Sequence, residues 1–150
     1  MTTAFRLPKG GRIDRTKPIV VRFNGSEVPA FQGDTAASAL LANGIHFVGR
    51  SFKYHRPRGI MSHGSEEPNA LLDVDRGGNR REPNNRATVV EAFDGLALKS
   101  QNHWPSLTFD VGEINDRLGA IFVAGFYYKT FMWPPKFWTS VYEPIIRRAA

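Results

Sequence analysis

Apolar and polar positions in the first third of the chain follow the pattern of two short strands. Residues 19–23 form a largely β-branched run that ends at Asn24-Gly25, a pair typical of tight hairpin turns. Residues 27–31 form the return strand, in which Pro29 has no backbone N–H to donate and is therefore expected at a sheet edge. This stretch predicts a β-hairpin with its second strand on the outside of a sheet.

A short helix is predicted directly after the hairpin. Asp34 is a favourable N-cap residue, Leu40 and Leu41 supply an apolar stripe, and Asn43-Gly44 supplies a left-handed stop. A long loop then leads back into strands. A hairpin, one packed helix and further strands predict an α+β fold.

The second half of the chain predicts more strands and one more short helix. Residues 70–74 and 87–91 are predicted strands, residues 75–86 a surface connection between them, and residues 96–98 a further short strand. Asp110 is expected to cap a short helix over residues 112–118.

From residue 119 onwards the composition becomes aromatic. Nine of the eighteen aromatic residues lie between Gly119 and Tyr142, and Pro134-Pro135 prevents one continuous helix there. A domain of this size cannot easily bury so many large side chains in its own core. Because a large exposed aromatic patch marks an interface, we predict that this segment docks onto a partner surface.

Length and composition limit the class of protein. The 150 residues, 41% of them hydrophobic, fit one ordinary domain. We expect an extended basic arm at residues 1–17, the α+β domain at 18–109, and the aromatic docking segment at 110–150. No apolar run approaches the roughly 20 residues of a membrane-spanning helix, and the first residues have no signal-peptide pattern. We therefore expect a cytoplasmic protein with no membrane partner.

The net charge of +6 raises the question of nucleic-acid binding. Cations gather at residues 6–17, 50–58 and 76–86, and Phe52 and Tyr54 are interleaved with those of the second group, as in single-strand binding surfaces. No motif of a known nucleic-acid-binding module accompanies them. A basic surface that faces acidic neighbouring subunits is the preferred interpretation.

The most specific pattern lies between residues 49 and 74. Ser62, Glu67 and Ala70 have the spacing of the first three cysteines in a plant-type two-iron ferredoxin, C-x4-C-x2-C. The chain contains no cysteine, and serine, glutamate and alanine are poor or useless substitutes for thiolates. The pattern predicts a ferredoxin-like loop that holds no cluster.

Long irregular strings carry a resemblance to one family. SFKYHRPRGIMSHGSEEPNALLDV, REPNNRATVVEAFDGLALKSQNHWPSLTFDVGEINDRL and AGFYYKTFMWP resemble the N-terminal ferredoxin-like segment of the α subunit of heterotetrameric sarcosine oxidase. Related amino-acid dehydrogenases and cyanide synthases keep the cysteines after a similar RPRG. The resemblance implies a β-grasp fold of the 2Fe-2S ferredoxin type without its cluster.

The same resemblance implies a role within a larger enzyme. Such complexes oxidatively demethylate sarcosine to glycine, release hydrogen peroxide and pass the one-carbon unit to tetrahydrofolate, with FAD, FMN and NAD bound. The present chain ends where the family continues into a dinucleotide-binding domain. We therefore expect a non-catalytic scaffold segment without cofactors of its own, whose partners are the rest of the α subunit and the other subunits. The alternative is a stand-alone basic module that binds a redox protein or nucleic acid.

Three further groups of residues are candidates for a site. The four histidines, His46, His55, His63 and His103, match no zinc spacing. Glu66-Glu67 beside a histidine suggests acid–base chemistry, but a solvated acidic pair is more usual in a proline-bounded loop. The stretch 56–59, RPRG, offers two guanidinium groups either to an anion or to carboxylates such as Glu66 and Asp73. No nucleotide-binding motif occurs, so no catalytic, cofactor or metal residue is predicted.

Overall fold

The predicted hairpin is confirmed in the computed structural model, which describes residues 5–78, 80–119 and 137–145. Strands β1 (Asp14–Phe23) and β2 (Ser26–Gln32) pair antiparallel across a turn in which Asn24 and Gly25 both have positive φ, 49° and 87°. Strand β1 begins at residue 14, so residues 14–17 belong to the strand and not to the extended arm expected there.

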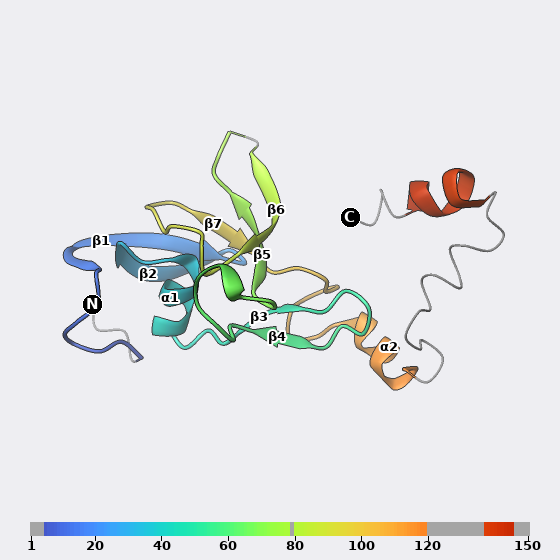
Figure 1. The fold of residues 1–150 in the computed structure, drawn as a ribbon, viewed down its shortest axis with the longest axis horizontal. Coiled ribbons are helices and arrows are strands. Elements are labelled where there is room, and N and C mark those ends of the chain that lie inside the picture. Colours follow the sequence, from blue (N-terminus) through green and yellow to red (C-terminus); the bar gives the residue numbers. More distant parts are fainter. Residues whose placement is uncertain (1–4, 79, 120–136, 146–150) are drawn as a thin grey trace. The chain divides into compact units, whose positions relative to one another are not determined.

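Three more strands complete a mixed five-stranded sheet in the order β2-β1-β7-β5-β6 (Figure 1). They are β5 (Leu71–Asp75), β6 (Arg81–Arg86) and β7 (Ala97–Lys99). The pair β1–β7 is parallel, and the other neighbours are antiparallel. Strand β2 lies at one edge, as Pro29 predicted. A separate two-stranded sheet joins β3 (Phe47–Arg50) and β4 (Pro57–Gly59), which the sequence pattern did not predict.

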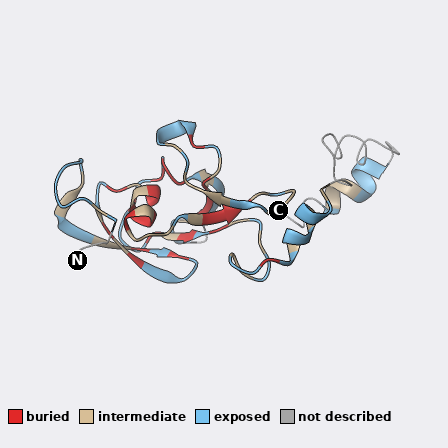
Figure 2. Ribbon diagram, turned by 90° about the horizontal axis from the view of Figure 1, so that it is seen from below, coloured by how far each residue is buried: buried red, intermediate tan, exposed pale blue. Residues whose placement is uncertain are grey.

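Helix α1 (Ala36–Ala42) completes the core beside the sheet. Its buried residues are mostly alanines together with Leu40, and small side chains let the helix backbone lie close to its neighbours. The opposing side chains come from alternate strand positions such as Val21, Val74 and Leu98, all at most 1% exposed. Figure 2 shows the buried residues gathered in α1 and the middle of the sheet.

The predicted helix N-cap was wrong by one residue. Thr35 is the N-cap: its hydroxyl accepts the Ser38 N–H at 3.1 Å, and the Ser38 hydroxyl accepts the Thr35 N–H at 2.9 Å. The Asp34 carboxylate instead forms a bidentate ion pair with Arg6, at 3.0 and 2.7 Å. Arginine offers two parallel N–H donors to a carboxylate, and that competing partner takes Asp34 away from the capping role.

The strand predicted at residues 87–91 was also wrong, because these residues lie in a turn. Ala87 and Val90 are buried and Val89 is exposed, and the backbone of this turn serves α1: the Ala87 and Val90 oxygens accept the Ala37 and Ala36 N–H groups at 2.9 and 2.8 Å. The first N–H groups of a helix need partners from outside the helix. The real strand is β6, inside the stretch expected as a surface connection.

The remaining local predictions are confirmed. Strands β5 and β7 lie within one residue of the predicted strands at 70–74 and 96–98. Asp110 caps a 3₁₀ turn (Val111–Glu113) by accepting the Gly112 N–H at 3.1 Å, and α2 (Ile114–Arg117) follows.

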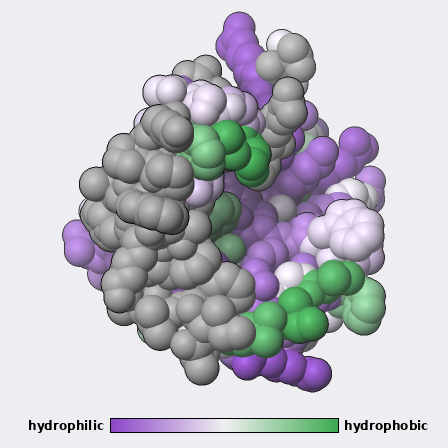
Figure 3. All heavy atoms as spheres, turned by 90° about the vertical axis from the view of Figure 1, so that its right-hand side faces the viewer, coloured by the Kyte–Doolittle hydropathy of each residue, from purple (hydrophilic) through white to green (hydrophobic). Residues whose placement is uncertain are grey.

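The chain divides into two compact units, Met1–Ile114 and Asn115–Ala150. Most of the predicted aromatic docking segment lies outside the described residues. Its described part contains a π-helical turn (Trp138–Tyr142), where Phe137 and Trp138 are exposed. On the face drawn in Figure 3, hydrophilic side chains predominate among those described, with apolar ones in small separate groups. No helix among the described residues is long and apolar enough to cross a membrane.

Candidate functional site

The loop of residues 61–70, between β4 and β5, is organised by the side chain of Glu67. This carboxylate accepts four backbone N–H groups: those of Met61 and Ser62 at 2.8 and 2.7 Å on Oε2, and those of Asn69 and Ala70 at 2.8 and 3.0 Å on Oε1. Glu67 is only 1% exposed. The two halves of the loop are therefore joined through one buried anion.

The hydrogen bonds keep this anion charged in spite of its burial. Burial alone would raise the pKa of Glu67, because the charged form loses its hydration. The backbone N–H groups of Ser62, Asn69, Ala70 and Met61 act in the opposite direction and outweigh it, so the pKa lies below its ordinary value. Glu67 is therefore a carboxylate, and not a carboxylic acid, at neutral pH.

The three positions with cluster-ligand spacing do not fit an iron–sulfur cluster. The Glu67 oxygens are already engaged by the backbone, Ala70 is fully buried and has no ligating atom, and the buried Ser62 hydroxyl has no hydrogen-bond partner in the described part of the chain. The chain offers no thiolate. The loop keeps a ferredoxin-like spacing without a ligand set.

Side chains from beyond the loop hold it in place. The Thr88 hydroxyl donates to the Gly64 carbonyl at 2.5 Å, and Arg86 Nε donates to the Glu67 carbonyl at 3.2 Å. From β4, Arg58 donates to the side-chain oxygen of Asn69. Sequence analysis did not identify Thr88, because the residues around it were expected to form a strand.

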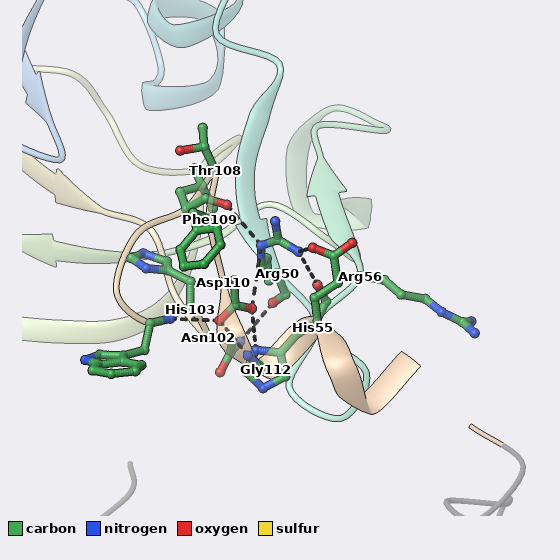
Figure 4. A network of polar contacts seen from close by, with 12 residues as sticks. Arg50, His55, Arg56, Asn102, His103, Thr108, Phe109, Asp110 and Gly112 are labelled. Carbon is green, nitrogen blue, oxygen red and sulfur yellow. Dashed lines mark hydrogen bonds and ion pairs between the residues drawn. The ribbon is translucent and has the colours of Figure 1, made fainter. Parts of the chain in front are cut away.

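A second polar network lies between β3 and the segment that follows β7 (Figure 4). One oxygen of Asp110 accepts the Trp104 and Gly112 N–H groups at 2.9 and 3.1 Å. The other lies 2.6 Å from His55 Nδ1 and 3.6 Å from Arg50 Nε. Burial alone would raise the pKa of Asp110, but the hydrogen bonds from Trp104, His55 and Gly112 and the charge of His55 together lower it.

Arg50 extends this network to several backbone carbonyls. It is 5% exposed and donates to the carbonyls of Leu107 and His55 at 3.0 and 2.7 Å, and to the exposed Glu113 carboxylate at 3.3 Å. Its own carbonyl accepts the Asn102 side chain at 3.0 Å. The network binds residues 102–113 to β3 and the turn after it, which is a structural cross-link.

The histidines weighed as metal ligands lie in different surroundings. The His46 ring packs edge-on against Phe5, with 5.7 Å between ring centroids, and His103 Nε2 lies 2.6 Å from the Ser100 hydroxyl. His55 contacts Asp110, while His63 precedes the 3₁₀ turn at Gly64–Glu66. In the described ranges, no group of three or more potential metal-binding side chains occurs.

The remaining candidate pairs are also separated. Glu66 is exposed whereas Glu67 is buried, so the two carboxylates do not form an acid–base pair. Arg56 lies over the Tyr54 ring, 4.8 Å from its centroid, and Arg58 contacts Asn69.

Of the two carboxylates expected as possible partners of these arginines, Glu66 is exposed and Asp73 lies on β5. Asp73, the buried one, is paired with Arg81 from β6.

Known proteins similar to this chain are α subunits of sarcosine oxidase. Sarcosine oxidase subunit alpha of Rhizobium meliloti (strain 1021) is 58% identical over 148 residues, which are 99% of this chain and 15% of that protein. The same subunit of Corynebacterium sp. (strain P-1) is 49% identical over 77 residues, 49% of this chain and 8% of that protein. The chain thus spans less than a sixth of these relatives.

A solved structure and a family match complete the comparison. L-proline dehydrogenase from P. horikoshii has a TM-score of 0.47 and 24% identity, over 61% of this chain and 17% of that one. Residues 16–103 match the family described as a 2Fe-2S iron-sulfur cluster binding domain. The mixed sheet and few helices of this chain agree with a ferredoxin-like α+β fold. The chain belongs to this domain family, and over nearly its whole length it is similar to a segment of sarcosine oxidase α subunits.

Proposed function

We propose that this chain is the cluster-free β-grasp segment of a sarcosine oxidase α subunit, and that it serves there as a scaffold. One observation carries the proposal: a buried carboxylate closes the loop in which Ser62, Glu67 and Ala70 have the spacing of ferredoxin cluster ligands. Without thiolates the loop has no means of holding an electron carrier. What remains for the domain is to fold and to support its neighbours.

The chemistry of the whole enzyme is assigned to other parts. We propose that the complete complex acts in the cytoplasm, oxidises sarcosine to glycine with release of hydrogen peroxide, and transfers the one-carbon unit to tetrahydrofolate. FAD, FMN and NAD would bind to the remainder of the α subunit and to the other subunits. No step of that reaction is assigned to a residue of this chain.

The segment after β7 is the proposed contact with the rest of the α subunit. Within eleven positions it exposes four large apolar residues: Trp104 and Phe109, about 70% exposed, and Val111 and Ile114, more than half exposed. The relatives are more than six times longer than this chain, so the rest of such a subunit is large enough to cover these apolar residues. The Arg50–Asp110 network fixes the backbone of the same segment, which prepares it for docking.

A segment exchange tests this function. In the Rhizobium meliloti α subunit, the matching 148 residues are replaced by this chain, and the chimera is co-expressed with the other subunits of that enzyme. We expect an assembled complex on size-exclusion chromatography, with sarcosine-dependent peroxide release near that of the unaltered enzyme. A version with the segment deleted should fail to assemble.

Two variants of the chimera test the proposed contact. Trp104→Ala with Phe109→Ala, both within the proposed contact, should lower the assembled fraction more than Phe52→Ala, an equally exposed aromatic in the loop after β3. An active complex from the deletion version would contradict the scaffold role. A chimera that folds but stays unassembled would favour a stand-alone interaction module.

A further inference from the structure

The 61–70 loop has the donor arrangement of an anion-binding site. Four backbone N–H groups, from residues 61, 62, 69 and 70, converge on one carboxylate, two on each oxygen. Converging main-chain N–H groups form concave sites that favour negative charge, in phosphate and iron–sulfur proteins alike. Here the anion is supplied by the loop itself, from Glu67.

The Glu67 carboxylate differs from a carboxylate in an ordinary ion pair in the groups that stabilise its charge. Its charge is stabilised by the N–H groups of Ser62, Asn69, Ala70 and Met61, and a neighbouring cation is not among the causes of its lowered pKa. The buried Ser62 hydroxyl beside it has no described partner. The loop is therefore shaped around an anion that its backbone recognises.

We propose that the loop is an internally occupied anion site: the Glu67 carboxylate replaces the anionic cluster as the group that orders the loop, and a small monocarboxylate can take its place. The family binds an iron–sulfur cluster, but this loop has no residues to hold one. The Glu67 carboxylate explains how the loop is ordered without it. The anionic centre is retained, and only its chemical identity differs. This inference does not depend on the enzyme to which the chain belongs.

The test is rescue of a shortened side chain by acetate. Glu67→Ala removes the atoms beyond Cβ, which correspond to one acetate ion, and leaves the four N–H groups without an acceptor. The intact 150-residue chain carrying this substitution should melt at a lower temperature than wild type at pH 7. Added acetate should raise that temperature in a saturable way, as a ligand of the folded state does.

Three proteins serve as controls at the same acetate concentrations. Wild type and Glu67→Gln have no space for acetate, and Glu66→Ala alters the exposed neighbouring carboxylate. All three should show only the common effect of added salt. In a titration followed by NMR, the amide signals of residues 61, 62, 69 and 70 should shift in Glu67→Ala and stay in place in Glu66→Ala.

The outcome is decisive even when Glu67→Ala does not fold in plain buffer. The variant is then refolded from urea in sodium acetate and, in parallel, in sodium chloride of equal ionic strength. Folding that requires acetate supports the proposal. Equal responses of all four proteins, or no folding in either salt, would overturn it.

Discussion

The Arg50–Asp110 network gives the sharpest test of how the fold is held together. Arg50 contacts two carboxylates: that of Asp110, whose side chain is fully buried, and that of Glu113, whose side chain is 58% exposed. Asp110 also accepts two backbone N–H groups and contacts His55. The same guanidinium group thus offers a buried and an exposed partner for comparison.

Removing the buried partner should cost far more than removing the exposed one. Asp110→Ala leaves the 4%-exposed Arg50 side chain without its buried counter-charge and leaves the Trp104 and Gly112 N–H groups without an acceptor. Breaking a buried pair in this way costs about 3–5 kcal/mol of unfolding free energy. Because Arg50 keeps two backbone carbonyls, we expect a value near the lower end, about 3 kcal/mol. Glu113→Ala should cost at most about 1 kcal/mol.

Urea denaturation at pH 7, followed by far-UV circular dichroism, measures both variants. Asp110→Asn is a useful third protein, because it keeps an oxygen for the backbone N–H groups but removes the charge, and should fall between the other two. Equal losses for Asp110→Ala and Glu113→Ala would refute the claim that burial makes this network important.

Three further predictions concern the helix start, a tight glycine and acid sensitivity. Thr35→Ala should cost about 0.5–2 kcal/mol as a lost cap, and Asp34→Ala about 3–5 kcal/mol as a broken buried pair; equal urea midpoints would contradict this order. Gly112→Ala places a Cβ where it would overlap the His55 ring, so it should lower stability by about 1–3 kcal/mol in the same assay, and an unchanged midpoint would show that the ring moves freely. The pKa of Glu67 is lowered by folding, so its stabilisation is complete at neutral pH and is lost as pH falls below about 4.3. The stability gap between wild type and Glu67→Gln should therefore shrink from pH 7 to pH 3, and a constant gap would argue against an ionised Glu67.

The parts of the fold that local signals determine were predictable. Asn24-Gly25 specified the hairpin, Pro29 its edge position, and Asp110 the helical turn after β7. In each case the residue acts through its own backbone conformation or on N–H groups close by.

The parts that depend on distant partners were not predictable. Asp34 carries a good capping side chain, but Arg6, 28 positions away, engages it. Residues 87–91 have a strand-like composition, yet their carbonyls cap α1. The edge strand β6 is polar and contains Pro83, so no apolar alternation marks it.

For the candidate site, the sequence predicted only that the loop lacks cluster ligands. The spacing of Ser62, Glu67 and Ala70, together with the missing cysteines, indicated a loop without a ligand set. That Glu67 turns inward and accepts four N–H groups depends on the loop conformation, which no local pattern shows. The same holds for Arg50 and Asp110, which lie 60 positions apart in sequence.

Anaerobic reconstitution with iron and sulfide asks whether this member of a cluster-binding family holds a cluster. The purified chain is incubated with ferrous iron, sulfide and a thiol reductant, desalted, and examined by visible absorption and iron analysis. A Ser62→Cys, Glu67→Cys, Ala70→Cys, Thr88→Cys variant serves as a comparison that offers thiolates around the loop. We expect that wild type retains no stoichiometric iron and shows no visible charge-transfer absorption. A stable spectrum with two irons per wild-type chain would contradict it.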